Sequence, residues 1–237
     1  MKYSPAPTPR QHRPTFTGDQ MQEQMPETST GRQFSTFPIG KRFNIVPENE
    51  PPPTDARIAL IMAAGAFGSG EHETSASCLE ELEQIPALQE KTVLDLGSGT
   101  GILALAAVKL GAKSALCVDI EPKAVKTCIY NCELNQVQDK VRHRCGTAAD
   151  IGGETFELII ANIYGDILLD IADDLLMHAS PGATLLFSGI LYEYNFDVRQ
   201  RYERLGCQVI KNRMLSEFST ILLRSPQRQG VVGSELR

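Results

Sequence analysis

Short apolar runs alternate with amphipathic segments over most of the chain. Runs such as 91–96 and 156–162 are apolar at most positions and bounded by turn residues, which is typical of strands buried on both faces of a parallel sheet. Between them, Val125, Cys128 and Ile129 recur at the spacing of one helix face. The alternation predicts a parallel sheet with helices on both faces.

The pattern also predicts the order of the elements. Strands are expected at 91–96, 114–119, 140–145, 156–162 and 183–189, and helices at 102–111, from Pro122 onward, at 165–177 and at 192–205. Ser180-Pro181-Gly182 is expected to form a turn. Two final runs, 207–214 and 217–224, predict an antiparallel hairpin. The expected fold class is α/β, with a doubly wound, mostly parallel seven-stranded sheet that ends in this hairpin.

Proline divides the chain unevenly, because ten of the 14 prolines lie in the first 53 residues. Residues 1–36 combine Pro, Ser, Thr and Gln with few aliphatic side chains, so we expect disorder there. Residues 37–55 are expected to hold a short strand and a Pro-rich linker. The globular domain is expected at 56–224, followed by a loose tail at 225–237.

Charge and hydropathy exclude several classes of function. The 23 basic and 29 acidic residues give a net charge of −6, which argues against binding nucleic acid by bulk charge. His143, between Arg142 and Arg144, is expected on a solvated strand face rather than in a nucleic-acid patch. No apolar run reaches the length of a membrane span, and the first residues lack the apolar core of a secretory signal.

Six cysteines lie in segments that otherwise resemble core, and no Cys-x-x-Cys pair is present. This predicts reduced, mostly buried thiols in a cytoplasmic protein, without a metal site. Cys128 and Cys132 have the i, i+4 spacing of a ligand pair. They also continue an apolar helix face, so core packing is the preferred interpretation.

The segment between the strand at 91–96 and the next helix holds the first candidate site. It reads Asp95-Leu-Gly97-Ser-Gly99-Thr-Gly101, and Ile102 stands where a dinucleotide fingerprint would have its third glycine. Three glycines allow a tight turn and close approach of a ligand, and the following helix offers free N–H groups. The alternative is a tight strand–helix turn without a ligand.

Two polar residues close other strands of the expected sheet. Asp119 ends the strand at 114–119, where a carboxylate can accept hydrogen bonds from both hydroxyls of a ribose. Its alternative role is to cap the next helix, although Glu121 could do so instead. Asn162 ends the strand at 156–162, where it could bind an amine or cap a helix.

A glycine-rich loop at 65–75 leads into another predicted helix. Phe67 could lie against an adenine or a methionine chain, and Thr74 and Ser75 could donate hydroxyls to a carboxylate. His72 could be a base, a helix cap or a passive loop residue. The alternative is a surface loop with one aromatic side chain in the core.

Together these segments resemble the PrmA-type methyltransferases, which modify protein L11 of the large ribosomal subunit. The loop AFGSGEHETS at 66–75 is similar to the family's AFGTGTHPTT, and Asp95 to Ala104 matches its glycine-rich loop. The family's acidic residue falls on Asp119, its ANI segment on 161–163 and its SGIL segment on 188–191. The resemblance covers roughly residues 37–224.

The resemblance implies a class I, Rossmann-like methyltransferase that uses S-adenosylmethionine (SAM) and N-methylates a lysine or an N-terminal amino group of a ribosomal-protein-like substrate. It places the family's SAM contacts on Ser75, Gly97, Asp119 and Asn162. Within this scheme Asn162 is expected to orient the amine, and Ile163 and Tyr164 to line the pocket.

Two departures from the family bear on the substrate. Glu71 and Glu73 stand where the family has Thr and Pro, which adds negative charge to the loop. The family usually has a folded N-terminal domain that binds the ribosomal substrate, whereas about 36 residues precede the match here. A small molecule or a nucleic-acid base as methyl acceptor, and a non-catalytic SAM-binding scaffold, therefore stay open as alternatives.

Overall fold

The computed structural model describes residues 34–63 and 72–227, which belong to one compact unit, Gly31–Arg237. Its strands are β1 (Phe37–Ile39), β2 (Phe43–Pro47), β3 (Ile58–Met62), β4 (Thr92–Leu96), β5 (Ser114–Asp119), β6 (Val141–Cys145), β7 (Phe156–Asn162), β8 (Ala179–Leu191), β9 (Gln208–Met214) and β10 (Phe218–Arg224). Its α-helices are α1 (Glu73–Leu82), α2 (Ile102–Lys109), α3 (Pro122–Leu134), α4 (Gly165–Asp170), α5 (Ala172–Met177) and α6 (Tyr192–Arg204). Most of the predicted disordered segment and tail lies outside the described residues.

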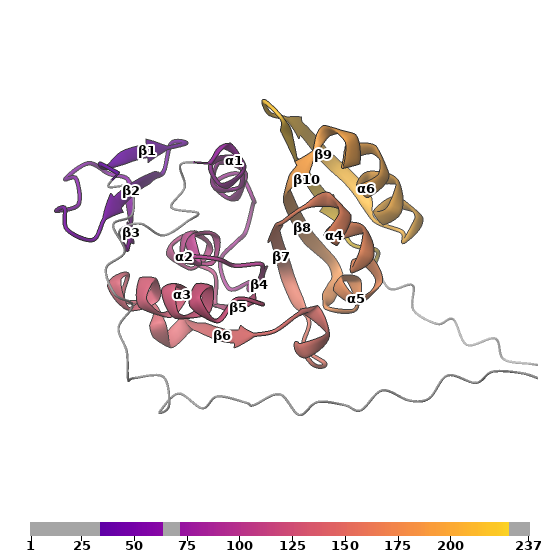
Figure 1. Ribbon diagram of the computed structural model, residues 1–237, viewed down its shortest axis with the longest axis horizontal. Helices are drawn as coiled ribbons and strands as arrows, with labels where there is room; N and C mark the ends of the chain where they lie inside the picture. Colours follow the sequence, from indigo (N-terminus) through magenta and orange to yellow (C-terminus); the bar gives the residue numbers. More distant parts are fainter. Residues whose placement is uncertain (1–33, 64–71, 228–237) are drawn as a thin grey trace, which may run out of the picture. The chain divides into compact units, whose positions relative to one another are not determined.

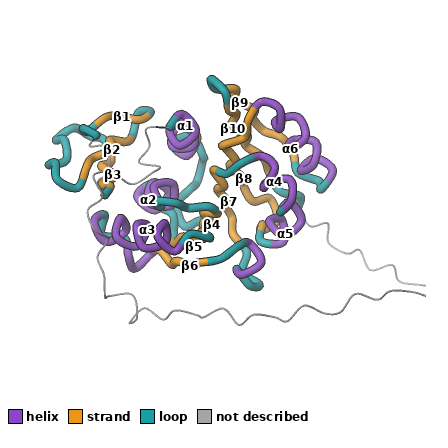
Figure 2. The backbone as a smooth tube through the Cα atoms, in the orientation of Figure 1, coloured by secondary structure: helices purple, strands orange, loops and turns teal. Residues whose placement is uncertain are grey.

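The main sheet has seven strands in the order β6-β5-β4-β7-β8-β10-β9. The first five run parallel, and β10 is antiparallel to both β8 and β9. Helices cover both faces of the sheet (Figures 1 and 2). Neighbouring residues of β4 belong to different hydrophobic clusters: Val93 lies in the cluster that includes α1, α2 and α3, and Leu94 in the cluster that includes α4, α5 and α6. The predicted fold class and hairpin are confirmed.

A second, three-stranded sheet precedes the main one. Where a single short strand was expected, β1 and β2 form an antiparallel pair, and β3 adds to β2 in parallel. The turn between β1 and β2 needs Gly40, whose φ is 55°, and whose missing Cβ would lie 2.5 Å from a carboxylate oxygen of Glu83. The buried side chains of this sheet belong to the same hydrophobic cluster as α1, α2 and α3.

Two predicted boundaries differ from the structure. The helix expected at 165–177 is divided into α4 and α5 at Ile171. The turn expected at 180–182 lies inside β8, where the pairing with β7 shifts from Phe156↔Ala179 to Leu158↔Thr184. Gly182, with a φ of 71°, allows this bulge without ending the strand.

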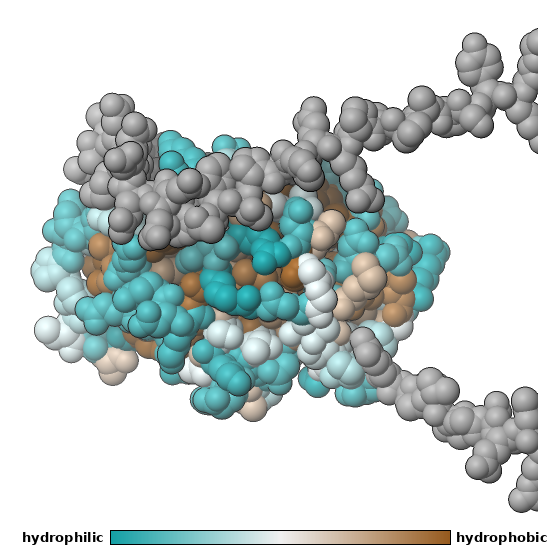
Figure 3. Space-filling model, turned by 90° about the horizontal axis from the view of Figure 1, so that it is seen from below, coloured by the Kyte–Doolittle hydropathy of each residue, from teal (hydrophilic) through white to brown (hydrophobic). Residues whose placement is uncertain are grey.

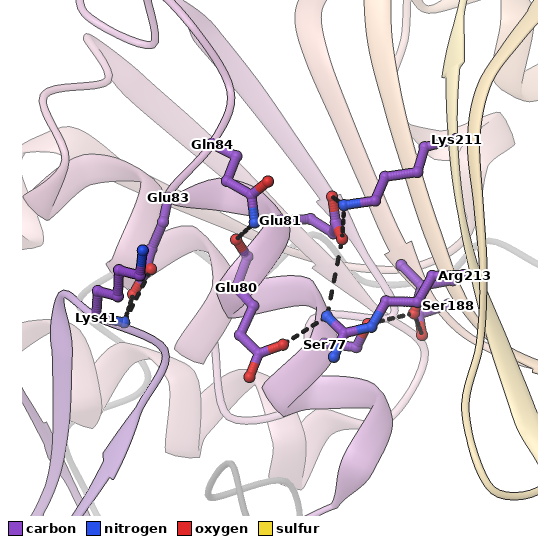
Figure 4. Close-up of polar contacts among 10 residues, drawn as sticks. Lys41, Ser77, Glu80, Glu81, Glu83, Gln84, Ser188, Lys211 and Arg213 are labelled. Atoms are coloured by element: carbon purple, nitrogen blue, oxygen red, sulfur yellow. Dashed lines mark hydrogen bonds and ion pairs between the residues drawn. The ribbon is translucent and has the colours of Figure 1, made fainter.

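Helix α1 connects the two sheets through its acidic side chains (Figure 4). At its end, the Glu83 carboxylate accepts hydrogen bonds from the backbone N–H groups of Lys41 and Arg42. On its other side, the buried carboxylate of Glu81 lies 2.7 Å from Nζ of Lys211 on β9. The helix therefore holds the first sheet and the C-terminal hairpin in fixed positions.

The described surface is mixed in polarity. Figure 3 shows one face, on which hydrophilic residues predominate and apolar residues show between them. Within residues 34–63 and 72–227, no helix is both long enough and apolar enough to cross a bilayer.

Candidate functional site

The predicted site residues gather at the carboxyl edge of the main sheet. The glycine-rich segment joins β4 to α2, Asp119 ends β5, and Asn162 ends β7. These strands are neighbours in the order β5-β4-β7, so their ends meet at one edge. In open α/β sheets, this edge is where ligands bind.

The three glycines of the segment have different surroundings. All have positive φ angles: 70° at Gly97, 53° at Gly99 and 78° at Gly101. A Cβ on Gly97 would lie 2.4 Å from the side chain of Ile163, and one on Gly101 would lie 2.3 Å from Sγ of Cys128. A Cβ on Gly99 would meet no described atom within 4 Å. Among the described residues, the segment is therefore sealed at its two ends and open at its centre.

Asp119 supports the open part of this segment. One of its carboxylate oxygens accepts a hydrogen bond from the N–H of Gly99 at 2.8 Å, and the other from the N–H of Glu121 at 2.9 Å. Glu121 itself is the N-cap residue of α3. The half-buried carboxylate keeps further lone pairs beside Gly99, where they can accept hydroxyl hydrogens from a ligand.

Asp95 supports the same segment from the interior. Its side chain is only 1% exposed, and Oδ2 accepts a hydrogen bond from the N–H of Ala104, in the first turn of α2, at 3.0 Å. Burial raises the pKa of Asp95 to about 7, although the hydrogen bond from Ala104 acts in the opposite direction. The structure thus gives Asp95 a role in positioning the helix, and its predicted ligand contact stays a prediction.

The start of α1 reaches the end of β7. The side-chain amide of Asn162 donates to Oγ of Ser75 at 3.3 Å, which joins two residues 87 positions apart in the chain. This bond directs Oδ1 of Asn162 toward β8, where a Cβ on Gly189 would lie 3.2 Å from it. Thr74 and Ser75 are both buried, whereas Phe67 lies outside the described residues.

His72 is the N-cap of α1. Its Nδ1 accepts from the N–H of Thr74 and lies 2.9 Å from the Thr74 hydroxyl. Its ring packs edge-on against Phe218, with the centroids 5.3 Å apart. Of the three roles open from the sequence, the structure supports the cap.

Glu73 does not act as a free negative charge at the loop. Its carboxylate accepts hydrogen bonds from the N–H groups of Ser216 and Glu217, in the turn between β9 and β10. Burial raises the pKa of Glu73, but the hydrogen bonds from this turn outweigh it, so that the net pKa is lowered. Glu73, which differs from the residue of the PrmA-type loop at this position, therefore links α1 to the C-terminal hairpin.

Sequence reasoning missed Asn131, a fully buried residue of α3. Its amide donates to the carbonyl of Thr100 at 2.9 Å, and its Oδ1 accepts from the N–H of Ala63 at 2.9 Å. One turn later, Asn135 accepts from the N–H of Ile61 and donates back to its carbonyl. The sequence did contain a clue to this role. Asn131 and Asn135 lie on the apolar face of the predicted helix, and a buried amide needs hydrogen-bond partners.

Large apolar side chains surround the same edge. Ile120 follows β5 and is 72% exposed, and Tyr164 follows β7 and is 64% exposed. Ile163 instead packs over Gly97. Of the two predicted pocket residues, the structure therefore leaves Tyr164 accessible and uses Ile163 to seal the glycine-rich segment.

Comparisons with known proteins agree with this geometry. A ribosomal protein L11 methyltransferase of Pelobacter propionicus is 40% identical over 201 residues, which are 82% of this chain and 65% of that protein. The chain thus spans less than two thirds of that relative. A crystal structure of a ribosomal protein L11 methylase from Lactobacillus delbrueckii subsp. bulgaricus superposes with a TM-score of 0.75 at 28% identity, and covers 83% of this chain and all of that one.

A more distant structure shares the fold. The RNA methyltransferase of Salinibacter ruber, solved with S-adenosyl-L-homocysteine, has a TM-score of 0.53 at 16% identity over 65% of this chain and 93% of that one. The family model of ribosomal protein L11 methyltransferases (PrmA) matches residues 4–226. The match spans both sheets and every residue of the site, and the chain belongs to this family.

Proposed function

We propose that the protein is a SAM-dependent methyltransferase that N-methylates a protein amine, with a ribosomal protein of the L11 type as its substrate. The observation that carries the proposal is the half-buried carboxylate of Asp119 beside the open backbone of Gly99. The names of the similar proteins from Pelobacter propionicus and Lactobacillus delbrueckii support the substrate.

The residues at the sheet edge fit an adenosine-bearing cofactor. Asp119 can accept hydrogens from both ribose hydroxyls while it keeps the hydrogen bond to Gly99. The exposed side chain of Ile120 offers apolar surface for a base, and the start of α2 offers N–H groups for polar atoms. Gly97 and Gly101 shape the segment. The fold shared with the Salinibacter ruber enzyme, which was solved with the demethylated cofactor, supports the assignment.

SAM supplies an electrophilic methyl group, so the protein has to hold a neutral amine in line with it and exclude water. Positioning of this kind is worth roughly 7–11 kcal/mol in well-oriented reactions. Asn162 suits the orienting role, because its NH₂ group is bound to Ser75 and its Oδ1 is the atom left to accept from an amine. Tyr164 offers an exposed aromatic wall beside it.

The same proposal includes the cell compartment and the domain organisation. A ribosomal-protein substrate places the enzyme in the cytoplasm. We assign cofactor binding and methyl transfer to residues 56–224, and the shared hydrophobic cluster makes the small sheet part of the same folded body.

Calorimetry with S-adenosylhomocysteine and SAM tests the cofactor site. We expect the wild type to bind both and the Asp119→Ala variant to bind at least about tenfold more weakly, because one charged hydrogen-bond acceptor is lost. Asp173→Ala, which removes an exposed carboxylate of α5, is the matched control and should bind as the wild type does. Absence of binding at millimolar ligand would refute the proposal.

Transfer of a labelled methyl group tests the reaction. The full chain is incubated with labelled SAM and purified ribosomal proteins, alongside whole lysate, and the products are separated by size and mass. Label on an L11-type protein supports the proposal. Label confined to small molecules or RNA contradicts the protein substrate, and binding without transfer to any pool favours a scaffold.

A further inference from the structure

Three potential metal ligands converge on the face of the main sheet that α3 covers. Cys117 of β5 and His143 of β6 are register partners in parallel strands, so their side chains point to the same face. Cys128 reaches this point from α3, which packs on both strands. The two sulfur atoms and a ring nitrogen of His143 all lie within 4.8 Å of one another.

The environment of His143 indicates that a partner belongs there. Its Nδ1 is buried and has no hydrogen-bond partner among the described residues. This differs from the solvated face expected from the sequence. An unpaired buried nitrogen lowers the stability of a fold, so such groups call for a specific explanation.

We propose that Cys117, Cys128 and His143 form a binding site for a soft divalent cation, Zn²⁺ in particular. Two sulfurs and one imidazole are donors that zinc prefers, and three protein ligands leave one coordination position open. A tetrahedral zinc with Zn–S bonds of ~2.3 Å holds its ligands roughly 3.8 Å apart, so only small side-chain movements are needed. As two Zn–S bonds form, two thiol protons pass to solvent, and no oxidant is involved.

The position of the site gives it a structural consequence. The sulfur of Cys128 is the atom against which Gly101 packs, at the end of the glycine-rich segment. A cation that fixes this sulfur therefore also fixes that end of the segment. Cation binding at this cluster is separate from methyl transfer and can be measured without an active enzyme.

The test titrates the full reduced chain with Co²⁺, a spectroscopic substitute for Zn²⁺, in a non-thiol reductant. All proteins carry Cys145→Ser, which removes the exposed cysteine. We expect one equivalent of Co²⁺, thiolate-to-cobalt charge-transfer and tetrahedral d–d absorption bands, and their displacement by Zn²⁺. His143→Gln should weaken the affinity about tenfold or more. Cys117→Ala leaves Cys128 as the one thiolate of the cluster, so it should weaken the affinity likewise and reduce the charge-transfer absorption of each bound Co²⁺.

The matched control is Cys207→Ala, because Cys207 is also a buried free thiol but lies outside the cluster. It should bind Co²⁺ as the parent does. Zn²⁺ should raise the melting temperature of the parent and of Cys207→Ala but not of His143→Gln, whose folding is checked by circular dichroism. The proposal is overturned if the parent binds no more Co²⁺ than Cys117→Ala does, or if His143→Gln leaves affinity and spectrum unchanged.

Discussion

On both its inner side, toward the core, and its outer side, toward the sheet edge, the glycine-rich segment is held by an aspartate that accepts a backbone hydrogen bond, but the two aspartates differ in exposure. On the inner side, Asp95 accepts a backbone hydrogen bond from Ala104 and is 1% exposed. On the outer side, Asp119 accepts one from Gly99 and is half-buried, beside described backbone that is open. Both carboxylates hold the segment through one backbone hydrogen bond. Asp95 is otherwise surrounded by the core and has a structural role, whereas Asp119 is partly exposed and can also bind a ligand.

The glycines show the same division. Gly97 and Gly101 are sealed by Ile163 and Cys128, whereas Gly99 faces open space among the described residues. Substitutions on the inner side should therefore lower the free energy of unfolding. Those on the outer side should lower cofactor affinity and leave stability nearly intact.

Gly101→Ala should have the largest effect on stability. The new Cβ would meet Sγ of Cys128 at 2.3 Å, and a φ of 78° is unfavourable for alanine. We expect the free energy of unfolding to fall by about 2–4 kcal/mol, from strain and overpacking together. Gly99→Ala, with the φ penalty alone, should lose about 1–2 kcal/mol but weaken cofactor binding more strongly.

Urea denaturation and calorimetry on both variants, with a chelator present, measure the two effects. Adding Cys128→Ala to Gly101→Ala removes the clashing sulfur and should restore part of the lost stability. Equal losses of stability at Gly99 and Gly101 would show that the inner side is not sealed as described.

The two asparagines of the site provide the next test. Asn131→Ala removes the two hydrogen bonds that this buried amide makes to the carbonyl of Thr100 and to the N–H of Ala63, and should cost about 2–3 kcal/mol. Asn162→Ala, at the half-buried edge, should change stability by less than ~1 kcal/mol and reduce methyl transfer instead. Urea denaturation and the labelled-methyl assay measure the two effects on both variants. A larger loss of stability in Asn162→Ala than in Asn131→Ala would contradict the division into inner and outer sides.

The sequence predicted the central strands well. The predicted strands 114–119 and 156–162 match β5 and β7 at both ends, and 91–96 differs from β4 by one residue. Strands buried on both faces are nearly all apolar and end in turn residues, so their limits are local properties. The placement of Asp119 and Asn162 at one edge follows from the parallel order of these strands.

What the sequence did not predict depends on contacts between distant segments. The first sheet is held by Glu83, 41 residues from Arg42, and by Asn135, 74 residues from Ile61. No local spacing encodes such pairs. The division of the helix at Ile171 and the register shift beside Gly182 were likewise not predicted from local spacing. The role of Asn131 could only have been inferred from a polar residue on an apolar helix face.

The raised pKa of the buried Asp95 leads us to expect an unusual dependence of stability on pH. Its folded pKa of about 7 lies above the unfolded value of ~3.9, so between these pH values unfolding releases a proton. The contribution of Asp95 to the free energy of unfolding therefore falls as pH rises, by up to about 1.4 kcal/mol per unit, and is flat above pH ~7.

Denaturation of the wild type and of Asp95→Asn at pH 5 to 8 isolates this contribution. The half-buried His143, with its lowered pKa, contributes with the opposite sign between pH ~4 and ~6.5, but equally in both proteins. The difference in stability should thus favour the wild type most at pH 5 and shrink toward pH 7. Parallel curves would contradict the burial of an ionisable carboxyl group on the inner side.

Glu73→Gln should have the smallest effect. The carboxylate binds the N–H groups of Ser216 and Glu217 but stays in contact with solvent, so its loss should cost at most about 0.5 kcal/mol at pH 7. Because the folded pKa is lowered, this stability exists above the unfolded pKa and is lost as pH falls through the folded one. Melting temperatures of Glu73→Gln and the wild type should therefore converge at low pH, while Glu203→Gln, at an exposed position of α6, should match the wild type throughout. A large loss of cofactor affinity in Glu73→Gln would instead place this carboxylate on the outer, ligand-binding side of the division, with Asp119.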